Sequence, residues 1–409
     1  MSQRIAALDL GNSKAACLVA ERGEHGVMKI LAAGSVPCRG LKRGSIVDLE
    51  EASESINEVL RDVQEDLDEP IESVILAVGG PQVFAQMVGG LHPIIPRSRP
   101  ITRDDVMQVV NHSRRQVLPP DQQEIQTIPH DFSIDGQKGI RKPLGMSGSK
   151  LEVRTMLISG NVGYLQNLSS AVSMGQRKVD QFVLRSMASG LGVLSADQLE
   201  LGTAVIDLGA GTTELGIFMN GSLAFSASIP IGAGTVSSDI SKLLKTSPEE
   251  AERLKLKFGT VTLGEINENE TVGVMQLGQI HERPLQRHVL CEIIDSRVRE
   301  IATLVSQQIE KSGYACSLTG GIALTGGGSL LPGIDDLFKS LLPDQRIRKA
   351  TPGFRGKSAS VLDTPGWATA VGLARYALNS NDDELTTAES GDSLTGKIKT
   401  IWSLISGRS

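Results

Sequence analysis

An internal repeat constrains the fold of this chain more than any other feature of its sequence. When the sequence is shifted by 198 residues, segment 6–23 (AALDLGNSKAACLVAERG) lies over segment 204–221 (AVIDLGAGTTELGIFMNG). Asp9 then falls on Asp207, and Gly11 on Gly209. Each copy has the pattern of an apolar strand ending in Asp-Leu-Gly, a turn of small residues and a second strand. Because a repeated unit predicts a repeated architecture, we expect two related α/β halves.

The two Asp-Leu-Gly turns are the first candidates for a binding site. Glycines let backbone N–H groups approach phosphate oxygens without obstruction by side chains. A third Gly-rich turn, in segment 321–333 (GIALTGGGSLLPG), joins a strand to a helix and leaves room for a base and a sugar. Asp9 and Asp207 can hold Mg²⁺ through its waters, because Mg²⁺ takes only one or two protein carboxylates. We therefore predict a nucleotide with Mg²⁺ clamped between the halves.

The candidate nucleotide-binding residues come from these three turns, from a fourth glycine turn at 229–234 (IPIGAG) and from the predicted helix 247–259. They are Asp9, Gly11, Asn12, Ser13, Lys14, Asp207, Gly209, Ala210, Gly211, Thr212, Thr213, Gly232, Gly234, Glu252, Lys255, Gly326, Gly327, Gly328 and Ser329. A plain loop is the alternative interpretation of the fourth turn. An ordinary ion pair within a helix is the alternative for Glu252 and Lys255.

Composition excludes several classes of protein. The chain of 409 residues has a formal net charge of −6, which argues against a protein that coats duplex nucleic acid. Its 13 aromatic residues (8 Phe, 2 Trp and 3 Tyr) are too few to favour a stacking platform for single strands. Four scattered cysteines predict reduced thiols, and the absence of a long apolar run predicts a cytoplasmic protein.

The C-terminal 31 residues, 379–409, divide into two segments of opposite charge. Residues 379–393 carry five acidic side chains and no Lys or Arg, which is typical of a solvated linker. Residues 394–409 predict an amphipathic helix whose apolar arc and flanking lysine suit a membrane interface. The residues of this interface are Leu394, Lys397, Ile398, Ile401, Trp402, Leu404 and Ile405. Docking of this helix on the protein's own body is the alternative.

Three motifs in a fixed order carry a resemblance to a known superfamily. DLGNSK, IDLGAGTTELGIF and ALTGGGSLLPG resemble the two phosphate loops and the adenosine motif of the actin, heat-shock-70 and sugar-kinase ATPases. Segment 247–259 (SPEEAERLKLKFG) resembles the helix whose Glu and Lys meet ribose and adenine, here Glu252 and Lys255. The resemblance implies ATP as the nucleotide. It leaves ATP hydrolysis open, because related proteins often carry Thr at the position of Asn12.

Within this superfamily the chain resembles the FtsA family of bacterial division proteins. The supporting segments are PCRGLKRGSIVDLE (37–50), IPHDFSIDGQKGIRKPLGMSGSKLEV (128–153) and RPLQRHVLCEIIDSRVREI (283–301). The implied fold is an actin-like duplicated α/β ATPase fold with two halves around a nucleotide cleft. A small inserted α+β domain and a C-terminal amphipathic helix complete it.

The implied function is that of an adaptor at the cytoplasmic face of the inner membrane at the division site. The protein would tether filaments of FtsZ, the tubulin-like ring protein, through its C-terminal helix on anionic lipid. It would self-associate into filaments and help to recruit later division proteins. The FtsZ C-terminal peptide would dock near Arg287 and Arg297, for which a solvated helix face is the alternative. A cell-shape or pilus-assembly actin homologue, a small-molecule kinase and a chaperone-like ATPase are the alternative functions.

The expected domain organisation follows from the repeat and the resemblance. Residues 1–81 and 161–200 form the first half, interrupted by the inserted domain at 82–160. The second half contains its phosphate loop in 201–226, a small subdomain with the FtsZ docking surface in 227–306 and the adenosine motif in 307–354. Residues 355–378 return to the first half, before the linker 379–393 and the membrane helix 394–409.

Overall fold

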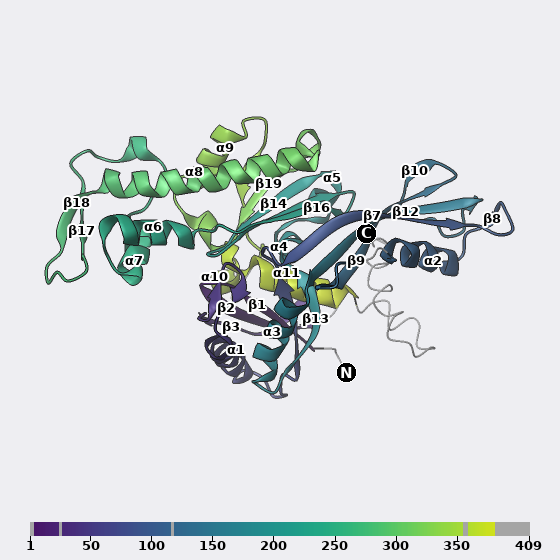
Figure 1. Ribbon diagram of the computed structural model, residues 1–409, viewed down its shortest axis with the longest axis horizontal. Coiled ribbons are helices and arrows are strands. Elements are labelled where there is room, and N and C mark those ends of the chain that lie inside the picture. The colour runs from purple at the N-terminus through teal and green to yellow at the C-terminus, as the bar shows by residue number, and fades with distance from the viewer. Residues whose placement is uncertain (1–3, 24–26, 116–117, 355–358, 381–409) are drawn as a thin grey trace.

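The computed structural model describes residues 4–23, 27–115, 118–354 and 359–380 (Figure 1). The predicted membrane helix 394–409 lies outside these residues, as does the predicted linker from residue 381 onward. The last described helix ends at Ser380, so the first two residues assigned to the linker belong to a helix. Among the described residues, no helix combines the length and the apolar character needed to cross a bilayer.

Two five-stranded sheets form the centres of the two halves. The first sheet has the order β13-β6-β1-β2-β3 and the second has the order β16-β15-β14-β19-β20. The strands of the first are β1 (Arg4–Leu10), β2 (Lys14–Arg22), β3 (Met28–Pro37), β6 (Ser73–Val78) and β13 (Lys178–Leu184). Those of the second are β14 (Thr203–Leu208), β15 (Thr213–Met219), β16 (Ser222–Ile229), β19 (Gly321–Thr325) and β20 (Ile347–Lys349).

The duplication predicted from the sequence extends to the pairing of individual residues. Asp9 pairs with Ala16 across β1 and β2, and Asp207 pairs with Glu214 across β14 and β15. In each pair the two residues lie seven positions apart in the sequence. The shift of 198 residues therefore maps one hairpin onto the other in register. Each half then adds a parallel neighbour, β6 beside β1 and β19 beside β14. The prediction of two related α/β halves is confirmed.

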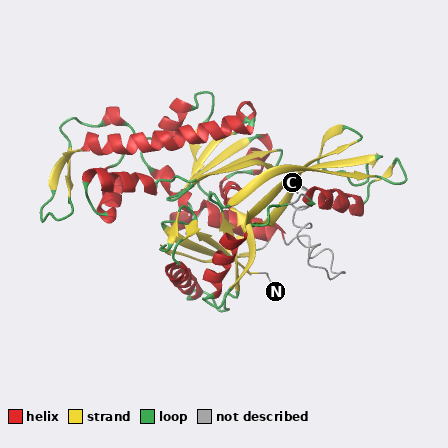
Figure 2. Ribbon diagram, viewed as in Figure 1, coloured by secondary structure: helices red, strands yellow, loops and turns green. Residues whose placement is uncertain are grey.

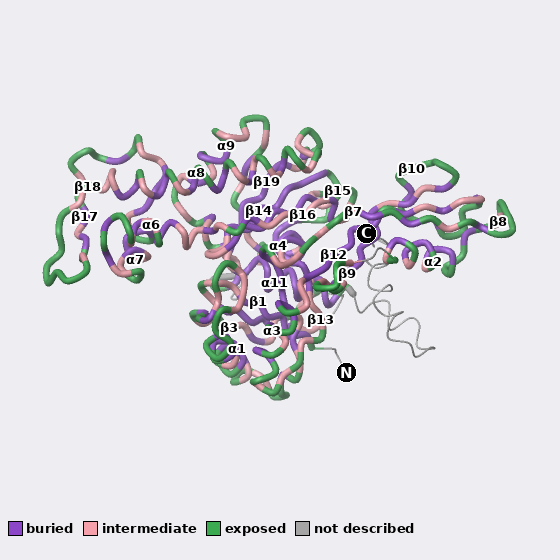
Figure 3. Tube along the Cα trace, viewed as in Figure 1, coloured by how far each residue is buried: buried purple, intermediate pink, exposed green. Residues whose placement is uncertain are grey.

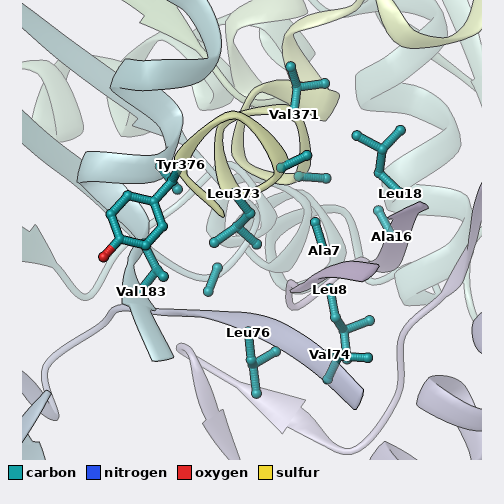
Figure 4. Close-up of a cluster of buried hydrophobic side chains, with 14 of the residues drawn as sticks. Ala7, Leu8, Ala16, Leu18, Val74, Leu76, Val183, Val371, Leu373 and Tyr376 are labelled. Carbon is teal, nitrogen blue, oxygen red and sulfur yellow. The ribbon is translucent and has the colours of Figure 1, made fainter. Parts of the chain in front are cut away.

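Helices cover the first sheet and close its core (Figures 2 and 4). They are α1 (Leu49–Gln64), α3 (Val162–Ser173), α10 (Ala359–Leu362) and α11 (Ala368–Ser380), with the short hairpin β4 (Leu41–Lys42) and β5 (Ser45–Ile46) nearby. Leu8 and Leu76 on the strands pack with Leu373 of α11 in one buried cluster. Asp48 caps α1, where its side chain accepts from the N–H groups of Glu50 and Glu51.

The second sheet carries several helices. They are α5 (Ala196–Leu201), α6 (Gly234–Leu244), α7 (Pro248–Phe258), α8 (Arg287–Ser312) and α9 (Ile334–Leu341), beside the hairpin β17 (Thr271–Val274) and β18 (Arg283–Gln286). Of these helices, α6, α7 and α8 extend to one end of the molecule (Figure 1). The predicted helix 247–259 corresponds to α7, where the side chain of Ser247 accepts from the N–H of Glu250 and Pro248 opens the helix.

The inserted domain lies at the opposite end of the long axis from the β17–β18 hairpin (Figure 1). Its elements are β7 (Val83–Pro93), β8 (Arg99–Pro100), α2 (Arg103–Arg114), β9 (Gln122–Ile134), β10 (Gln137–Ile140), β11 (Ser147–Gly148) and β12 (Lys150–Asn161). The long strands β9 and β12 pair with each other. One part of each lies in a small separate core that includes Phe132 and Val153, and the other part reaches the first half's core through Ile128 and Met156.

Two helices lie between the two sheets and connect the halves (Figure 1). Helix α4 (Arg185–Val193) follows β13, and it packs against α11. A Cβ atom added to Gly372 of α11 would lie 1.7 Å from the carbonyl oxygen of Ala188 on α4. Likewise, a Cβ on Gly192 would lie 2.0 Å from the carbonyl oxygen of Ala368. Glycine at both positions therefore lets the two backbones touch, and this crossing is deeply buried (Figure 3).

Candidate functional site

A cavity of about 860 Å³ lies between the two halves. Its walls include the turn after β1, the turn after β14, the turn after β19 and helix α7. This volume falls in the range of sites for small molecules and cofactors. The sequence therefore predicted which turns meet, although they lie far apart along the chain.

The two phosphate-loop candidates form matching turns. The N–H of Gly11 donates to the carbonyl oxygen of Lys14 at 3.0 Å, and that of Gly209 donates to Thr212 at 3.0 Å. The turns face each other closely, since a Cβ on Gly211 would lie 2.1 Å from Oδ1 of Asn12. Asn12 Oδ1 itself accepts the N–H of Gly44 at 2.8 Å, so the side chain also supports the wall of the cavity.

Most of the predicted nucleotide-binding residues line this cavity. They are Asp9, Gly11, Asn12, Ser13, Lys14, Asp207, Gly209, Ala210, Gly211, Thr212, Gly234, Glu252, Lys255, Gly326, Gly327 and Gly328.

Three predicted residues, Thr213, Gly232 and Ser329, do not line the cavity but support its turns from behind. Thr213 Oγ1 donates to the carbonyl oxygen of Ile231 at 2.8 Å, and Ser329 Oγ donates to that of Gly326 at 2.7 Å. Gly232 packs so closely that an added Cβ would lie 2.4 Å from the carbonyl oxygen of Gly209. All three therefore lie behind the cavity wall, where their hydroxyls or backbones contact other parts of the protein.

Helix α7 brings Glu252 and Lys255 to the far wall. Lys255 Nζ donates to Glu252 Oε2 at 2.7 Å and to the carbonyl oxygen of Ala233 at 3.3 Å. Ser237 Oγ also donates to Glu252. The pair thus forms the ordinary helix ion pair that was the alternative, while both residues also face the cavity.

Arg185, which the sequence analysis missed, lies among the carboxylates on the floor of the cavity. Its Nη1 donates to Asp9 Oδ1 at 2.5 Å, and its Nη2 donates to the carbonyl oxygen of Leu10 at 3.0 Å. Burial alone would lower the pKa of Arg185, but Asp9, Asp207 and Glu214 raise it above its usual value. A signal was available, because Arg185 directly follows β13, which runs parallel to β6 and through it to β1. The carboxyl ends of parallel strands meet at one edge of a sheet.

The other two carboxylates near Arg185 are held by neutral donors. Asp207 Oδ2 accepts from Ser189 Oγ at 2.5 Å and from Thr369 Oγ1 at 3.0 Å. Glu214 Oε1 accepts from the N–H of Gly80 at 2.9 Å and from Ser228 Oγ at 3.0 Å. Burial raises the pKa of both carboxyl groups, although Arg185 acts against it.

These contacts bear on the predicted magnesium site. The hydration shell of Mg²⁺ needs carboxylate oxygens that can accept from its waters. Asp9 is paired with Arg185, and Asp207 already accepts two hydroxyl groups. The free carboxylate pair that the magnesium prediction needs is therefore not present, because Asp9 Oδ1 is held by Arg185 and Asp207 Oδ2 is held by Ser189 and Thr369.

Lys14 adds a second cation near the phosphate turns. Its Nζ lies 4.9 Å from the centre of the Trp367 ring, a cation–π distance. Burial lowers the pKa of Lys14, while Asp9 and Asp207 act to raise it. Lys42 and Arg43 also line the cavity. The cavity wall thus holds cations that can attract an anion, beside its carboxylates.

Arg287 and Arg297, the predicted docking residues, are both paired within the protein. Arg287 Nη1 lies 3.0 Å from Glu270 Oε2, and Arg297 Nε lies 2.6 Å from Asp239 Oδ2. Arg297 also pairs with Glu300. Both arginines lie at the start or in the middle of α8, partly exposed.

Comparison with known proteins identifies the family. A family model described as "Cell division protein FtsA" matches residues 204–372, and one described as "SHS2 domain inserted in FTSA" matches residues 91–159. Cell division protein FtsA of Pseudomonas aeruginosa is 32% identical over 389 residues, which are 95% of this chain and 93% of the relative. That of Bacillus subtilis is 33% identical and covers 90% of this chain and 82% of its own length.

The chain belongs to the FtsA family of cell division proteins.

Solved structures place this FtsA-family chain in the actin-like fold. The PilM–PilN type IV pilus biogenesis complex matches with a TM-score of 0.65 at 16% identity, covering 91% of this chain and 98% of that chain. MreB5 of Spiroplasma citri bound to ADP matches with a TM-score of 0.55 at 14% identity, covering 91% and 96%. These pilus and MreB proteins share the fold, whereas the FtsA relatives share sequence along nearly the whole chain. The predicted fold of duplicated halves with an inserted domain is confirmed.

Proposed function

We propose that this FtsA-family protein is a membrane adaptor for FtsZ filaments whose body binds an adenine nucleotide between its halves. One observation carries the nucleotide part of the proposal: the two repeated glycine turns and the third glycine turn line one cavity of about 860 Å³. MreB5 of Spiroplasma citri, which shares the fold, was solved bound to ADP and to AMPPNP.

The lining of the cavity supports a proposed position for each part of ATP. The phosphates lie at the turns of Gly11 and Gly209, where backbone N–H groups and Lys14 approach them. The base lies between the turn 326–328 and α7, beside Lys255 and the exposed Leu256. Closure of the halves on ATP would set the surface that a second copy meets in a filament.

The remaining parts of the proposal concern partners. Residues 394–409 bind anionic lipid, and the FtsZ C-terminal peptide docks on the subdomain 227–306. Arg287 and Arg297 would bind an acidic peptide only if the carboxylates of the peptide displaced Glu270 from Arg287 and Asp239 from Arg297. The inserted domain, which projects from the body, contacts neighbouring copies or later division proteins (Figure 1). These activities place the protein at the cytoplasmic face of the inner membrane at the division site.

Co-sedimentation of FtsZ polymers with anionic liposomes tests the adaptor function. The full chain with ATP and a version truncated before Leu394 are compared. We expect only the full chain to bring FtsZ to the lipid, because the truncated version lacks the apolar arc that enters the interface. If neither version binds FtsZ, the adaptor function is wrong. If both recruit FtsZ to lipid equally, the role of residues 394–409 is wrong.

A further inference from the structure

The guanidinium of Arg185 is fixed at the point where the first phosphate turn begins. Arg185 opens α4, directly after β13. It donates to Asp9 Oδ1 at 2.5 Å and to the carbonyl oxygen of Leu10 at 3.0 Å, and so it is held at the carboxyl end of β1. Its side chain is only 15% exposed, and what remains exposed faces the cavity.

Arg185 is surrounded by acidic groups rather than by other cations. Asp9, Asp207 and Glu214 all act on it and keep it charged despite its burial. Of the three, Asp9 is the one in direct contact, while Asp207 and Glu214 are each held by neutral hydroxyl or backbone donors. The guanidinium therefore supplies the positive charge around which these carboxylates are arranged.

A divalent cation at the same carboxylates would compete with this guanidinium. Its hydration shell would need Asp9 and Asp207 as acceptors, and both carboxylates already accept from protein donors. The disagreement between the predicted magnesium site and the observed contacts thus comes from Arg185 at Asp9, and from the hydroxyl groups of Ser189 and Thr369 at Asp207.

We propose that Arg185 takes the place of the divalent cation, so that this chain binds the terminal phosphates of an adenine nucleotide through a guanidinium and needs no Mg²⁺ for affinity. A guanidinium carries five N–H donors in a planar fork that matches phosphate oxygens. Asp9 and Leu10 take one contact each from Nη1 and Nη2, which leaves donors for a phosphate at the turns of Gly11 and Gly209. The inference rests on the proposed nucleotide site.

Calorimetric titration of the full chain with ATP, in excess MgCl₂ and in excess EDTA, tests this inference. We expect the two dissociation constants of the unmodified protein to agree within about fivefold. In Arg185→Gln we expect binding in EDTA to weaken by about tenfold or more. Arg185→Lys keeps a charge and should retain part of the binding in EDTA.

A matched control separates loss of the charge at this position from loss of any buried arginine. Arg375 donates to the carbonyl oxygens of Leu191, Gly192 and Pro352, and it does not line the cavity. Arg375→Gln should therefore leave the ratio of the two dissociation constants as it is in the unmodified protein. Thermal unfolding of every variant checks that it folds.

The outcomes distinguish this inference from the proposed function. If the unmodified protein binds ATP more than about fivefold more tightly in MgCl₂ than in EDTA, Arg185 does not replace the cation, while the nucleotide site stands. An Arg185→Gln protein with an unchanged ratio also overturns the inference. If ATP binds under neither condition, the nucleotide site itself is wrong.

Discussion

Gly327 is the residue whose substitution tests the base-binding wall of the cavity most directly. An added Cβ would meet no atom within 4 Å, yet the residue lines the cavity. A side chain at this position therefore takes up ligand space without disturbing the fold. We expect Gly327→Val to weaken ATP binding by about tenfold or more, measured by calorimetric titration.

Gly264 provides the matched control for this substitution. Its added Cβ also meets nothing within 4 Å, but it lies in a short helical turn, Leu263–Glu265, away from the cavity. Gly264→Val should leave ATP affinity unchanged. Equal affinities for the two variants would show that the base does not lie against residue 327.

Asp105 makes the inserted domain sensitive to acid. Arg99 donates to both its oxygens at 2.6 and 2.7 Å, and the N–H of Thr102 donates at 2.8 Å. The Arg99 guanidinium holds the pKa of Asp105 well below its usual range, against burial, which alone would raise it. Because the folded pKa is lowered, the stabilisation is fully present above the unfolded pKa of about 3.9 and is lost as the pH falls below it.

Asp105→Asn measures this contribution. We expect it to lower the free energy of unfolding by about 2 kcal/mol at pH 7, and the difference from the unmodified protein to shrink near pH 3. Urea unfolding at both pH values is the measurement. The control Asp104→Asn changes an exposed carboxylate on the same helix and should have a small effect at both. A difference that does not depend on pH would contradict the ionic origin of the effect.

Single residues were predictable from the sequence where a glycine pattern marked them. Asp9 and Asp207 stand beside repeated glycines, and the structure places both at the cavity. No sequence pattern surrounds Arg185. It lies at the site because β13 pairs in parallel with β6, and β6 pairs in parallel with β1. Thr213 was also ambiguous, since strand alternation decides whether its hydroxyl faces the cavity or Ile231.

At the scale of elements, the crossing of α4 and α11 depends on two glycines. Gly372→Ala would force its Cβ against the carbonyl oxygen of Ala188, 1.7 Å away, so the helices would have to separate. We expect this variant to lower the free energy of unfolding by about 3 kcal/mol, measured by urea unfolding. Because this crossing connects the halves, the close packing of α4 against α11 fixes the position of one half relative to the other.

The same substitution in an uncrowded helix is the control. A Cβ added to Gly163 of α3 would lie at an ordinary contact distance, 3.4 Å, from its nearest neighbour, Asn161 Oδ1. Gly163→Ala should be neutral or stabilise by up to about 1 kcal/mol. If the two alanines destabilised equally, close packing at the crossing would not explain the loss.

Elements were predicted well wherever local signals define their ends. The predicted helix 247–259 is an example, because the hydroxyl of Ser247 accepts from the N–H of Glu250 and this cap is a local interaction. Thr102 caps α2 through the same kind of contact with the N–H of Asp105. The crossing of α4 with α11 was not predicted, because the approach of segments 180 residues apart leaves no local pattern.

At the scale of the whole molecule, the duplication was visible in the sequence and the asymmetry was not. The repeat predicted two halves, and their hairpins agree in register. The extensions at the two ends of the long axis differ entirely, one an inserted sheet and the other the helices around the β17–β18 hairpin (Figure 1). The inserted domain also contacts helix α5, where Arg141 Nη1 donates to Glu200 Oε2 at 2.9 Å.

Helix α11 has a mechanical consequence for a tethered molecule. Near the start of α11, Thr369 donates to Asp207 on the floor of the cavity. The helix ends at Ser380, before the predicted linker and the predicted membrane helix 394–409. If residues 394–409 anchor the protein to lipid, any tension between the membrane and a bound filament is transmitted to the two halves through α11. The load then acts on the α4–α11 crossing and on a carboxylate of the cavity, so that pulling and nucleotide occupancy would act on the same structural element.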